Sequence, residues 1–401
     1  MTAEISANVN RPYLPETGGG ISCELVVEPE SQDATAQRYV SLCIDSSGSM
    51  SYDKMDQVRD AVKVVFGLLN DDDYLSIVTF DNEVDVVLEA TRWGSLDREE
   101  AERIVEEDIE TAGGTDIYRG LEEAKKSLAE LPDREGVSKR ILLLSDGRDL
   151  RRDAHEFEPL AKAVADGGIS VYSAGLGTNY DQDIIRTMGE QSQGRWTHVT
   201  KPTDIRSFFG DVIQEASTVV ANNPKLVIDP IPGCEVAEAF RRRPQVQQVD
   251  LEHQDDSVVV RLPDLQNREE QRVVLKMDAP GQEVGTTAPI ADVELQGAAG
   301  DASTAIEVGY TDDEEKLAQQ DPDVFLSFRD TKIRTQIAQA EEGEDLDEVK
   351  DLIEETEVVT GDTQIVASLR DDVTRIEDGD EEEVRRVQEN TTVVYDDSRF
   401  D

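Results

Sequence analysis

Short apolar runs alternate with amphipathic segments between about residues 38 and 217. Three of these runs, residues 38–46, 140–147 and 169–177, end in polar loops, which is typical of buried strands in a parallel sheet. Between the runs, apolar residues recur at helical spacing, as they do over residues 54–69. Strands that alternate with helices in this way predict an open α/β sheet with helices on both faces.

One pair of strands departs from this alternation. The apolar runs 74–80 and 84–90 are separated only by Asp81, Asn82 and Glu83, which is too short a link for a helical crossover. We therefore expect these two strands to be antiparallel neighbours within an otherwise parallel sheet.

The pattern changes after about residue 220. Short segments, several of which alternate apolar and polar residues, are separated there by turn residues, which predicts an antiparallel β-sandwich. The predicted strands are residues 225–229, 234–239, 246–251, 257–262, 271–277, 291–296 and 304–309. The N-terminal segments 4–12 and 22–29 have the same strand-like pattern and lack a partner before the α/β region. We expect them to pair with strands after residue 220, so that the α/β domain is an insertion in the sandwich.

The pattern from residue 311 onward is helical and very acidic. Apolar residues recur there at helical spacing in three groups, which fit two or three amphipathic helices. The last stretch, from about residue 377, is open to fraying or disorder. The expected domains are N-terminal strands that belong to the sandwich, an α/β domain, the rest of the sandwich and an acidic helical region, at residues 1–36, 37–220, 221–310 and 311–401.

Acidic residues dominate the composition. The 401 residues include 89 Asp and Glu against 40 Lys and Arg, a formal net charge of −49, and this balance excludes a basic surface for nucleic acid. The acids lie between well-formed apolar periods, so we favour a folded protein with an acidic shell over a disordered chain. This shell, with its scarce lysine, resembles haloarchaeal proteins, in which salt near 1 M shortens the Debye length to about 3 Å. The basic cluster Arg241–Arg243 is expected to be an exposed ion-pairing face.

The apolar runs and the N-terminus give no sign of a membrane segment or a signal peptide, and the cysteines give no sign of a zinc site. No run of about 18 apolar residues is present, and the N-terminus lacks the basic and apolar regions of a signal peptide. We therefore expect no membrane span and, by default, a cytoplasmic location. The spacing of Cys23, Cys43 and Cys234 matches no zinc motif.

Three polar segments of the α/β domain carry the candidate chemistry. They are Asp45-Ser46-Ser47-Gly48-Ser49 after the first strand, Gly113-Gly114-Thr115-Asp116 before a helix, and Ser145-Asp146-Gly147 after a later parallel strand. Ligands bind at the carboxyl ends of the strands in open α/β sheets, so these segments can meet at one edge.

The residue types in these segments suit a hard cation. Ser47, Ser49 and Thr115 supply neutral hydroxyl oxygens, and Asp45 and Asp146 supply charge, directly or through water. Magnesium prefers an octahedron of oxygens, and Mn²⁺ or Ca²⁺ could fill the same cage. Neutral ligands leave the ion electrophilic, so that it can accept a carboxylate from outside.

The segments DSSGS, GGTDI and SDG, in this order, resemble the metal-ion-dependent adhesion site of von Willebrand factor A domains. The resemblance covers about residues 37–217 and fills all five positions of the family site. It implies that the two serines and the threonine coordinate the ion, while the two aspartates act directly or through water. It also implies a doubly wound, Rossmann-like sheet with strand order 3-2-1-4-5-6 and an antiparallel third strand. More loosely, the flanking strands and acidic helices resemble bacterial and archaeal proteins related in layout to inter-alpha-trypsin inhibitor heavy chains.

Each candidate ligand also has a purely structural interpretation. The aspartate and serines after the first strand could cap the following helix, the threonine could be an N-cap, and the aspartate of the third segment could form a turn before glycine. The presence of all three segments favours the metal site. Three further acids near these segments, Asp53, Asp116 and Asp149, are expected to be surface acids or helix caps.

Three classes of function follow from these features. We favour a non-enzymatic module that binds an Asp or Glu carboxylate of a partner protein through Mg²⁺. A second class is a structural or regulatory scaffold that works with a partner such as an AAA+ ATPase, with the metal only stabilising the loop.

A third class, a magnesium-dependent phosphotransferase, is disfavoured. That reaction needs a nucleophilic aspartate, usually with a second acid two residues later, and a lysine near the site. Ser47 stands at the position of the second acid, and no lysine is expected close to the three segments. The sequence also lacks a P-loop, which argues against nucleotide hydrolysis.

Overall fold

The chain folds into two compact units, of which the second is inserted in the sequence of the first. Met1–Ser31 and Pro224–Asp401 form the first unit, and Gln32–Asn223 form the second. The computed structural model describes residues 3–30, 36–50, 52–107, 109, 111, 113–132, 136–149, 151–177, 179–199, 201–297, 302–340, 346–379 and 381–392. No helix in these ranges is long and apolar enough to cross a membrane.

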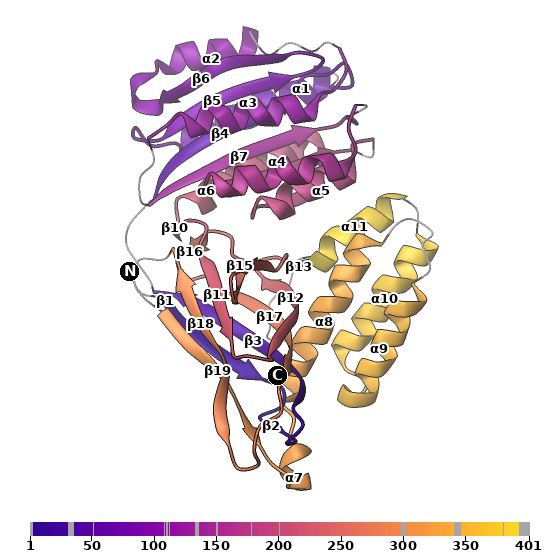
Figure 1. The fold of residues 1–401 in the computed structure, drawn as a ribbon. Coiled ribbons are helices and arrows are strands. Elements are labelled where there is room, and N and C mark those ends of the chain that lie inside the picture. Colours follow the sequence, from indigo (N-terminus) through magenta and orange to yellow (C-terminus); the bar gives the residue numbers. More distant parts are fainter. Residues whose placement is uncertain are drawn as a thin grey trace. The chain divides into compact units, whose positions relative to one another are not determined.

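The inserted unit is built on a six-stranded sheet with helices on both faces (Figure 1). Its strands are β4 (Gln37–Asp45), β5 (Tyr74–Phe80), β6 (Val84–Arg92), β7 (Val137–Ser145), β8 (Ile169–Leu176) and β9 (Arg195–Val199), with a short β10 (Val219–Ala221) at the end of the unit. Its helices are α1 (Tyr52–Leu68), α2 (Arg98–Glu107), α3 (Ile117–Ala129), α4 (Ala154–Asp166), α5 (Gln182–Gln191) and α6 (Ile205–Ala216), with 3₁₀ turns at Trp93–Ser95 and Pro202–Asp204.

The strand order of this sheet is β6-β5-β4-β7-β8-β9, which is 3-2-1-4-5-6 in the order of the unit's own strands. All neighbouring strands are parallel except β5 and β6, which pair antiparallel. Both the order and the antiparallel pair therefore agree with the expectation from sequence.

Side chains of the central strands alternate between two apolar cores. On β4, Val40, Leu42 and Ile44 face the core that includes helices α1, α2 and α6. Tyr39 and Cys43 of the same strand face the core that includes helices α3, α4 and α5. This explains why residues 39–44 of the strand are apolar at every position except Ser41, since both faces of a sheet covered by helices are buried.

The two ends of the inserted unit are joined to each other by a backbone hydrogen bond. Ala36, just before β4, donates its N–H to the carbonyl of Ser217, just after α6, over 3.0 Å. The unit therefore begins and ends at the same place.

The first unit contains two β-sheets of five and six strands, arranged as a sandwich (Figure 1). One sheet has the order β1-β3-β17-β12-β13, from β1 (Ala3–Val9), β3 (Gly19–Pro29), β17 (Gln271–Ala279), β12 (Glu235–Arg243) and β13 (Gln247–Gln248). The other has the order β14-β15-β11-β18-β19-β2, from β14 (Glu252–Gln254), β15 (Ser257–Arg261), β11 (Lys225–Pro230), β18 (Thr287–Gln296), β19 (Ala302–Tyr310) and β2 (Tyr13–Leu14). A two-residue strand, β16 (Leu265–Gln266), precedes β17.

The N-terminal strands belong to these sheets. β3 pairs antiparallel with both β1 and β17, and β2 pairs with β19. The first residues of the chain are therefore hydrogen-bonded to strands that come more than 200 residues later.

Helices complete the first unit after β19. They are α7 (Glu314–Leu317), α8 (Pro322–Gln339), α9 (Asp347–Thr360), α10 (Gln364–Asp378) and α11 (Glu381–Thr392). The last four share an apolar core, and Phe328 of α8 also packs edge-on against Phe240 of β12. The expectation of fraying from about residue 377 was wrong for α11, because its Val384 and Val387 are buried in this core. Residues 393–401 lie outside the described residues.

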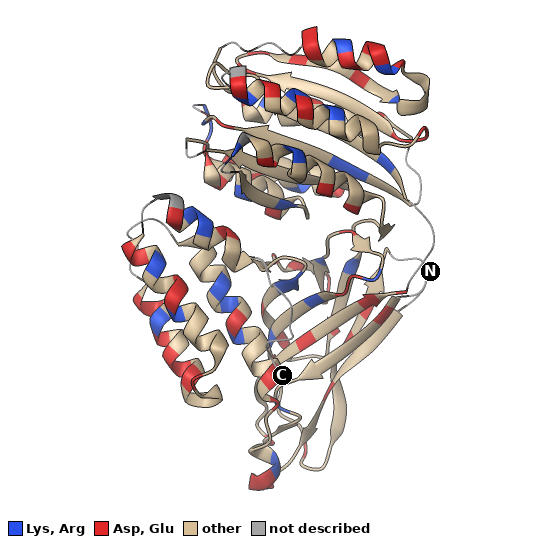
Figure 2. Cartoon of the chain, turned by 180° about the vertical axis from the view of Figure 1, so that it is seen from behind, with Lys and Arg blue, Asp and Glu red and all other residues tan. Residues whose placement is uncertain are grey.

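Acidic side chains lie on the helices and loops and also on strands of the sandwich, whereas the inner strands of the inserted unit are mostly uncharged (Figure 2). The buried faces of both units are supplied by apolar residues. This distribution fits a folded chain with an acidic exterior, because the net charge of −49 does not interrupt the cores.

The basic cluster Arg241–Arg243 is not an exposed face, which corrects the expectation from sequence. Arg241 and Arg242 are each only 1% exposed. The Arg242 guanidinium donates to the carboxylate of Asp330 on α8 over 2.9 Å, and Arg334 donates to the other oxygen of Asp330 over 2.7 Å. Arg242 therefore ties α8 to the sandwich through a buried ion pair.

We predict that Asp330→Asn destabilises the first unit, because it leaves the buried Arg242 without a countercharge. The expected loss in the free energy of unfolding is about 3 kcal/mol. Urea unfolding followed by circular dichroism measures it. The exposed helix residue Asp351 supplies the control, and Asp351→Asn should change stability little. Equal midpoints for the two variants would contradict the prediction.

The same ion pair should make stability depend on pH. Burial acts to raise the pKa of Asp330, but the neighbouring Arg334 and Arg242 outweigh it and hold the pKa below its ordinary value. The contribution is thus complete above the ordinary Asp pKa of about 3.9 and is lost as the pH falls below it. The stability difference between wild type and Asp330→Asn should therefore shrink below about pH 4.

Candidate metal centre

The three polar segments of the sequence meet at one edge of the sheet in the inserted unit. Asp45 is the last residue of β4, and Asp146 directly follows β7, its parallel neighbour. Thr115 lies in the loop before α3. Because Ile44 pairs with Leu144, the two strands end at the same level, with Asp45 next to Ser145 and Asp146 one residue further on.

Backbone contacts fix the loop between β4 and α1. Asp45 accepts a hydrogen bond from the Ser47 N–H over 2.8 Å, which curls the loop back over the strand end. Gly48 donates its N–H to the carbonyl of Gly113 over 3.2 Å, so the first and second segments are in direct contact. These bonds bring the serines toward the loop that carries Thr115.

Side-chain oxygens of this loop and of Asp146 are spaced as adjacent metal ligands are. The hydroxyl oxygens of Ser47 and Ser49 are 3.0 Å apart, and the Ser49 oxygen lies 2.7 Å from Oδ1 of Asp146. Adjacent oxygens of a magnesium octahedron, with bonds of about 2.0–2.1 Å, are separated by about 2.9 Å. The donor set therefore fits a small divalent cation, with which these oxygens could replace their mutual hydrogen bonds.

Thr115 reaches the site beside Gly147. A Cβ atom at position 147 would lie 2.5 Å from the Thr115 hydroxyl oxygen and 3.3 Å from Oδ2 of Asp45. Both oxygens thus surround the same glycine, and a side chain there would push into them. The structure brings all five candidate ligands to one place.

Burial differs among these five residues. Asp45, Ser47 and Asp146 are at most 2% exposed, whereas Ser49 is exposed and Thr115 is partly exposed. The carboxylates form the floor of the site, and hydroxyls lie at its open side. A group from outside would therefore approach past Ser49 and Thr115.

The buried carboxylates are electrostatically unfavourable without added positive charge. Burial raises the pKa of Asp45 to about 6, hydrogen bonds from Ser145 and Ser47 act to lower it, and the nearby Asp146 raises it. Two carboxylates held close together in a poorly solvated place favour a cation beside them.

Lys54 lies against this site, contrary to the expectation that no lysine is close to the three segments. Its ammonium group forms an ion pair with Oδ2 of Asp146 and donates to the carbonyl of Ser49 over 3.3 Å. Lys54 stands in the first turn of α1, five residues after Ser49. Sequence spacing alone could have suggested it, since this turn follows directly on the loop.

Two of the three acids near the site are buried. Asp116 is 1% exposed and caps α3, so the expectation of a surface acid or a cap is confirmed for it, whereas it was wrong for Asp149. Asp116 also pairs with Arg151 and Arg152, which follow the third segment. Asp149, 6% exposed, accepts a hydrogen bond from the Arg151 N–H over 2.9 Å. These contacts tie the loop of Thr115 to the loop of Asp146.

Within the described ranges, no cluster of three or more His, Cys, Asp or Glu side chains could hold a metal ion. A metal at this edge would therefore depend on hydroxyl oxygens together with two carboxylates. Such a donor set suits hard cations, since soft metals prefer sulfur or imidazole.

Comparisons with known proteins agree with this arrangement of sheet and loops. The family model described as "von Willebrand factor type A domain" matches residues 40–212. Residues 40–212 form a von Willebrand factor type A (VWA) domain.

Solved structures share the fold over nearly the whole chain, not only over the VWA domain. A von Willebrand factor type A protein from Catenulispora acidiphila superposes with a TM-score of 0.80 and 16% identity, covering 98% of this chain and 97% of that one. The ArnB paralog VWA2 from Sulfolobus acidocaldarius gives a TM-score of 0.64 and 16% identity, with 98% of each chain covered. At this identity, the likeness concerns the fold alone.

Relatives found by sequence match smaller shares of this chain and of their own length. The uncharacterized protein sll0103 of Synechocystis sp. is 26% identical over 271 residues, which cover 65% of this chain and 63% of that protein. Human inter-alpha-trypsin inhibitor heavy chain H2 is 29% identical over 192 residues, which cover 45% of this chain and 20% of the heavy chain. The matched part of this chain thus spans about a fifth of the heavy chain.

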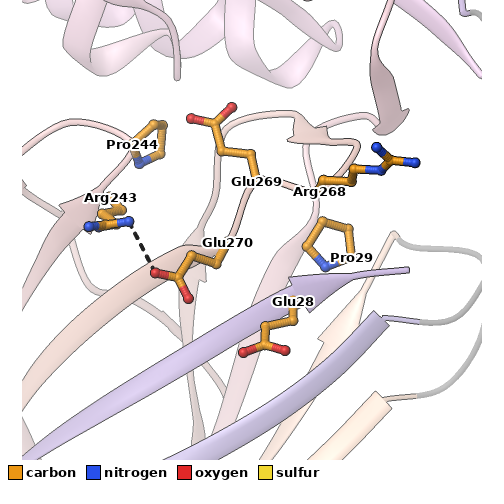
Figure 3. A pocket seen from close by; sticks show the side chains of 7 residues that line it. All are labelled: Glu28, Pro29, Arg243, Pro244, Arg268, Glu269 and Glu270. Carbon is orange, nitrogen blue, oxygen red and sulfur yellow. Dashed lines mark hydrogen bonds and ion pairs between the residues drawn. The ribbon is translucent and has the colours of Figure 1, made fainter. Parts of the chain in front are cut away.

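A hollow of about 550 Å³ on the first unit offers a different kind of site. Its lining mixes acidic and basic side chains (Figure 3): Glu28, Pro29, Arg243, Pro244, Arg268, Glu269 and Glu270. Arg243 and Glu270 neutralise each other there over 3.2 Å. The three segments at the strand ends resemble a known family site and this hollow does not, so the candidate metal centre of the VWA domain is the stronger candidate for a binding function.

We predict that Gly147→Ala weakens Mg²⁺ binding by the VWA domain about tenfold. The added Cβ atom would lie 2.5 Å from the Thr115 hydroxyl oxygen and would displace it. Isothermal titration calorimetry with MgCl₂ measures the effect.

Gly67 provides a matched control for this substitution. It lies within α1, and an added Cβ there would meet nothing within 4 Å. Gly67→Ala should leave the Mg²⁺ affinity unchanged. An unchanged affinity for Gly147→Ala as well would show that this glycine does not shape a metal site.

Proposed function

We propose that this protein binds an acidic side chain of a partner protein through a divalent cation, Mg²⁺ in the cell. Asp45, Ser47, Ser49, Thr115 and Asp146 would hold the ion. The observation that carries the proposal is the spacing of the side-chain oxygens, 3.0 Å and 2.7 Å between neighbours, at the common end of two parallel strands. Bound there, the ion would supply a Lewis-acidic position for a carboxylate oxygen of the partner.

The proposed ligands are of two kinds, two charged carboxylates and three neutral hydroxyls. Asp45 receives hydrogen bonds from the Ser47 N–H and the Ser145 hydroxyl, so protein donors hold it in place. Three of the five ligands are neutral hydroxyls, which donate less electron density than carboxylates and leave the ion electrophilic. A carboxylate from a partner would be a stronger ligand for this hard cation than a neutral group.

Basic side chains beside the site support an acidic partner. Arg148 is exposed and donates to the carbonyl of Asn179, and the Arg151 side chain is 48% exposed. In a chain with a net charge of −49, exposed arginines next to the metal loops favour approach of an acidic segment at this edge.

The arrangement favours binding over phosphoryl transfer for one specific reason. A lysine does lie at the site, so this requirement of a phosphotransferase is met. The acid two residues after the candidate nucleophile Asp45 is absent, because Ser47 occupies that position and its hydroxyl contacts Ser49 instead. The site therefore lacks the group that would transfer a proton during the reaction.

Removal of one carboxylate tests the metal site. Asp146→Asn should lower the Mg²⁺ affinity by about 100-fold, because the buried carboxylate is lost from the donor set. Calorimetric titration of MgCl₂ at constant ionic strength measures the affinity. Asp56→Asn, which alters an exposed carboxylate on α1, should leave it unchanged. Absence of heat and of thermal stabilisation in the wild type would remove the proposal.

A metal-dependent pull-down tests the class of partner. Partners bound by the full chain in Mg²⁺ should be released by EDTA and should not bind Asp146→Asn. An added peptide rich in Asp and Glu should compete with them, and the same peptide with Asn and Gln in their place should not. Partners that are retained in EDTA would assign binding to the sandwich and helices, as expected of a scaffold.

A further inference from the structure

Lys54 occupies a position that an ordinary surface lysine would not take. Its ammonium group is paired with Oδ2 of Asp146, a side chain with 0% exposure, while the lysine side chain itself is 29% exposed. The other oxygen of Asp146 accepts the hydroxyl of Ser49. Lysine and serine together therefore engage both oxygens of a proposed metal-site carboxylate.

Among the described residues, Lys54 is the basic residue that contacts the carboxylate pair of Asp45 and Asp146. Asp45 is held by neutral donors, the Ser47 N–H and the Ser145 hydroxyl. Two buried carboxylates and one ammonium leave one negative charge uncompensated. A dication in place of the ammonium would neutralise the two carboxylates, and a dication beside the ammonium would be repelled by it.

The helix itself does not favour this placement. Lys54 lies in the first turn of α1, where the helix dipole favours negative charge and disfavours a cation. Lys63 lies further along the same helix and pairs instead with the exposed Glu106, which does not belong to the three segments at the strand ends. Asp146, and not the local helix, therefore accounts for the position of Lys54.

We propose that Lys54 is an internal counter-ion of the metal site, which neutralises Asp146 until a divalent cation displaces it. Lys54 thereby sets the metal concentration at which the site becomes able to bind a partner. This inference rests on the proposed function, because it concerns the same five ligands. Its physical basis is competition between Lys54 and the metal ion for Asp146. The apparent dissociation constant for Mg²⁺ equals the intrinsic constant divided by the fraction of molecules in which Lys54 has left Asp146.

Replacement of the charge by an apolar chain of similar length tests the proposal. Lys54→Met should bind Mg²⁺ about tenfold more tightly than the wild type, because no tethered cation competes. Without metal, it should melt about 2–4 °C lower, because the carboxylates lose their counter-ion. Calorimetry with MgCl₂ and thermal unfolding of the full chain, each in EDTA and in Mg²⁺, measure both effects.

Two further variants separate charge from structure. Lys54→Arg keeps the charge and should behave nearly as the wild type in both measurements. Lys63→Met removes a lysine from the same helix but away from the site, and should leave the Mg²⁺ affinity unchanged. Circular dichroism establishes that each variant is folded.

The outcomes distinguish this inference from the proposed function. If the wild type binds Mg²⁺ and Lys54→Met binds it equally or more weakly, Lys54 is not a competing counter-ion and the inference is overturned. If neither protein binds Mg²⁺, the proposed function fails and the inference fails with it. If Lys54→Met binds Mg²⁺ and the wild type does not, the lysine blocks the site and the inference is supported.

Discussion

The parallel pairing of β4 with β7 is the constraint on which the proposed metal centre depends. Its register places Ile44 opposite Leu144, so the two strands run out at the same level and deliver Asp45 and Asp146 to one edge. Apolar side chains of both strands lock that register, because they alternate between two separate cores and a shift by one residue would exchange them. The core packing and the geometry of the site are therefore specified by the same residues.

Positive and negative charge are balanced locally in this chain despite its large net charge. Arg242 compensates Asp330 beneath the helices, Lys54 compensates Asp146 at the strand ends, and Arg151 compensates Asp116 between two loops. Each acid in these pairs is at most 3% exposed, so each would be costly to bury alone. Basic residues thus accompany these three buried acids, whereas the buried Asp45 is held by neutral hydrogen-bond donors.

Much of this architecture could be predicted from the sequence. The apolar strands, the antiparallel link at residues 81–83 and the three polar segments are local patterns, and the strand order followed from the family resemblance. What failed depends on long-range contacts. Asp116 caps a helix, as one of the two expected alternatives, but nothing in its own segment shows that Arg151 and Arg152 fold back onto it and bury it.

The prediction that Arg241–Arg243 form an exposed face failed for the same reason. Its burial is possible because Asp330, nearly 90 residues later, supplies the countercharge. Lys54 was overlooked although it lies close in sequence, because the reach of a flexible side chain across a loop does not show in a motif.

The hydrogen bond between Ala36 and Ser217 has a consequence for the history of the chain. A folded segment whose ends adjoin acts, from the viewpoint of its host, as a very short loop, and short loops cost little entropy to close. Such a segment could be gained, lost or exchanged between genes without requiring the host strands to separate. The arrangement would allow a VWA domain to be inserted as an independently folded unit into other host domains.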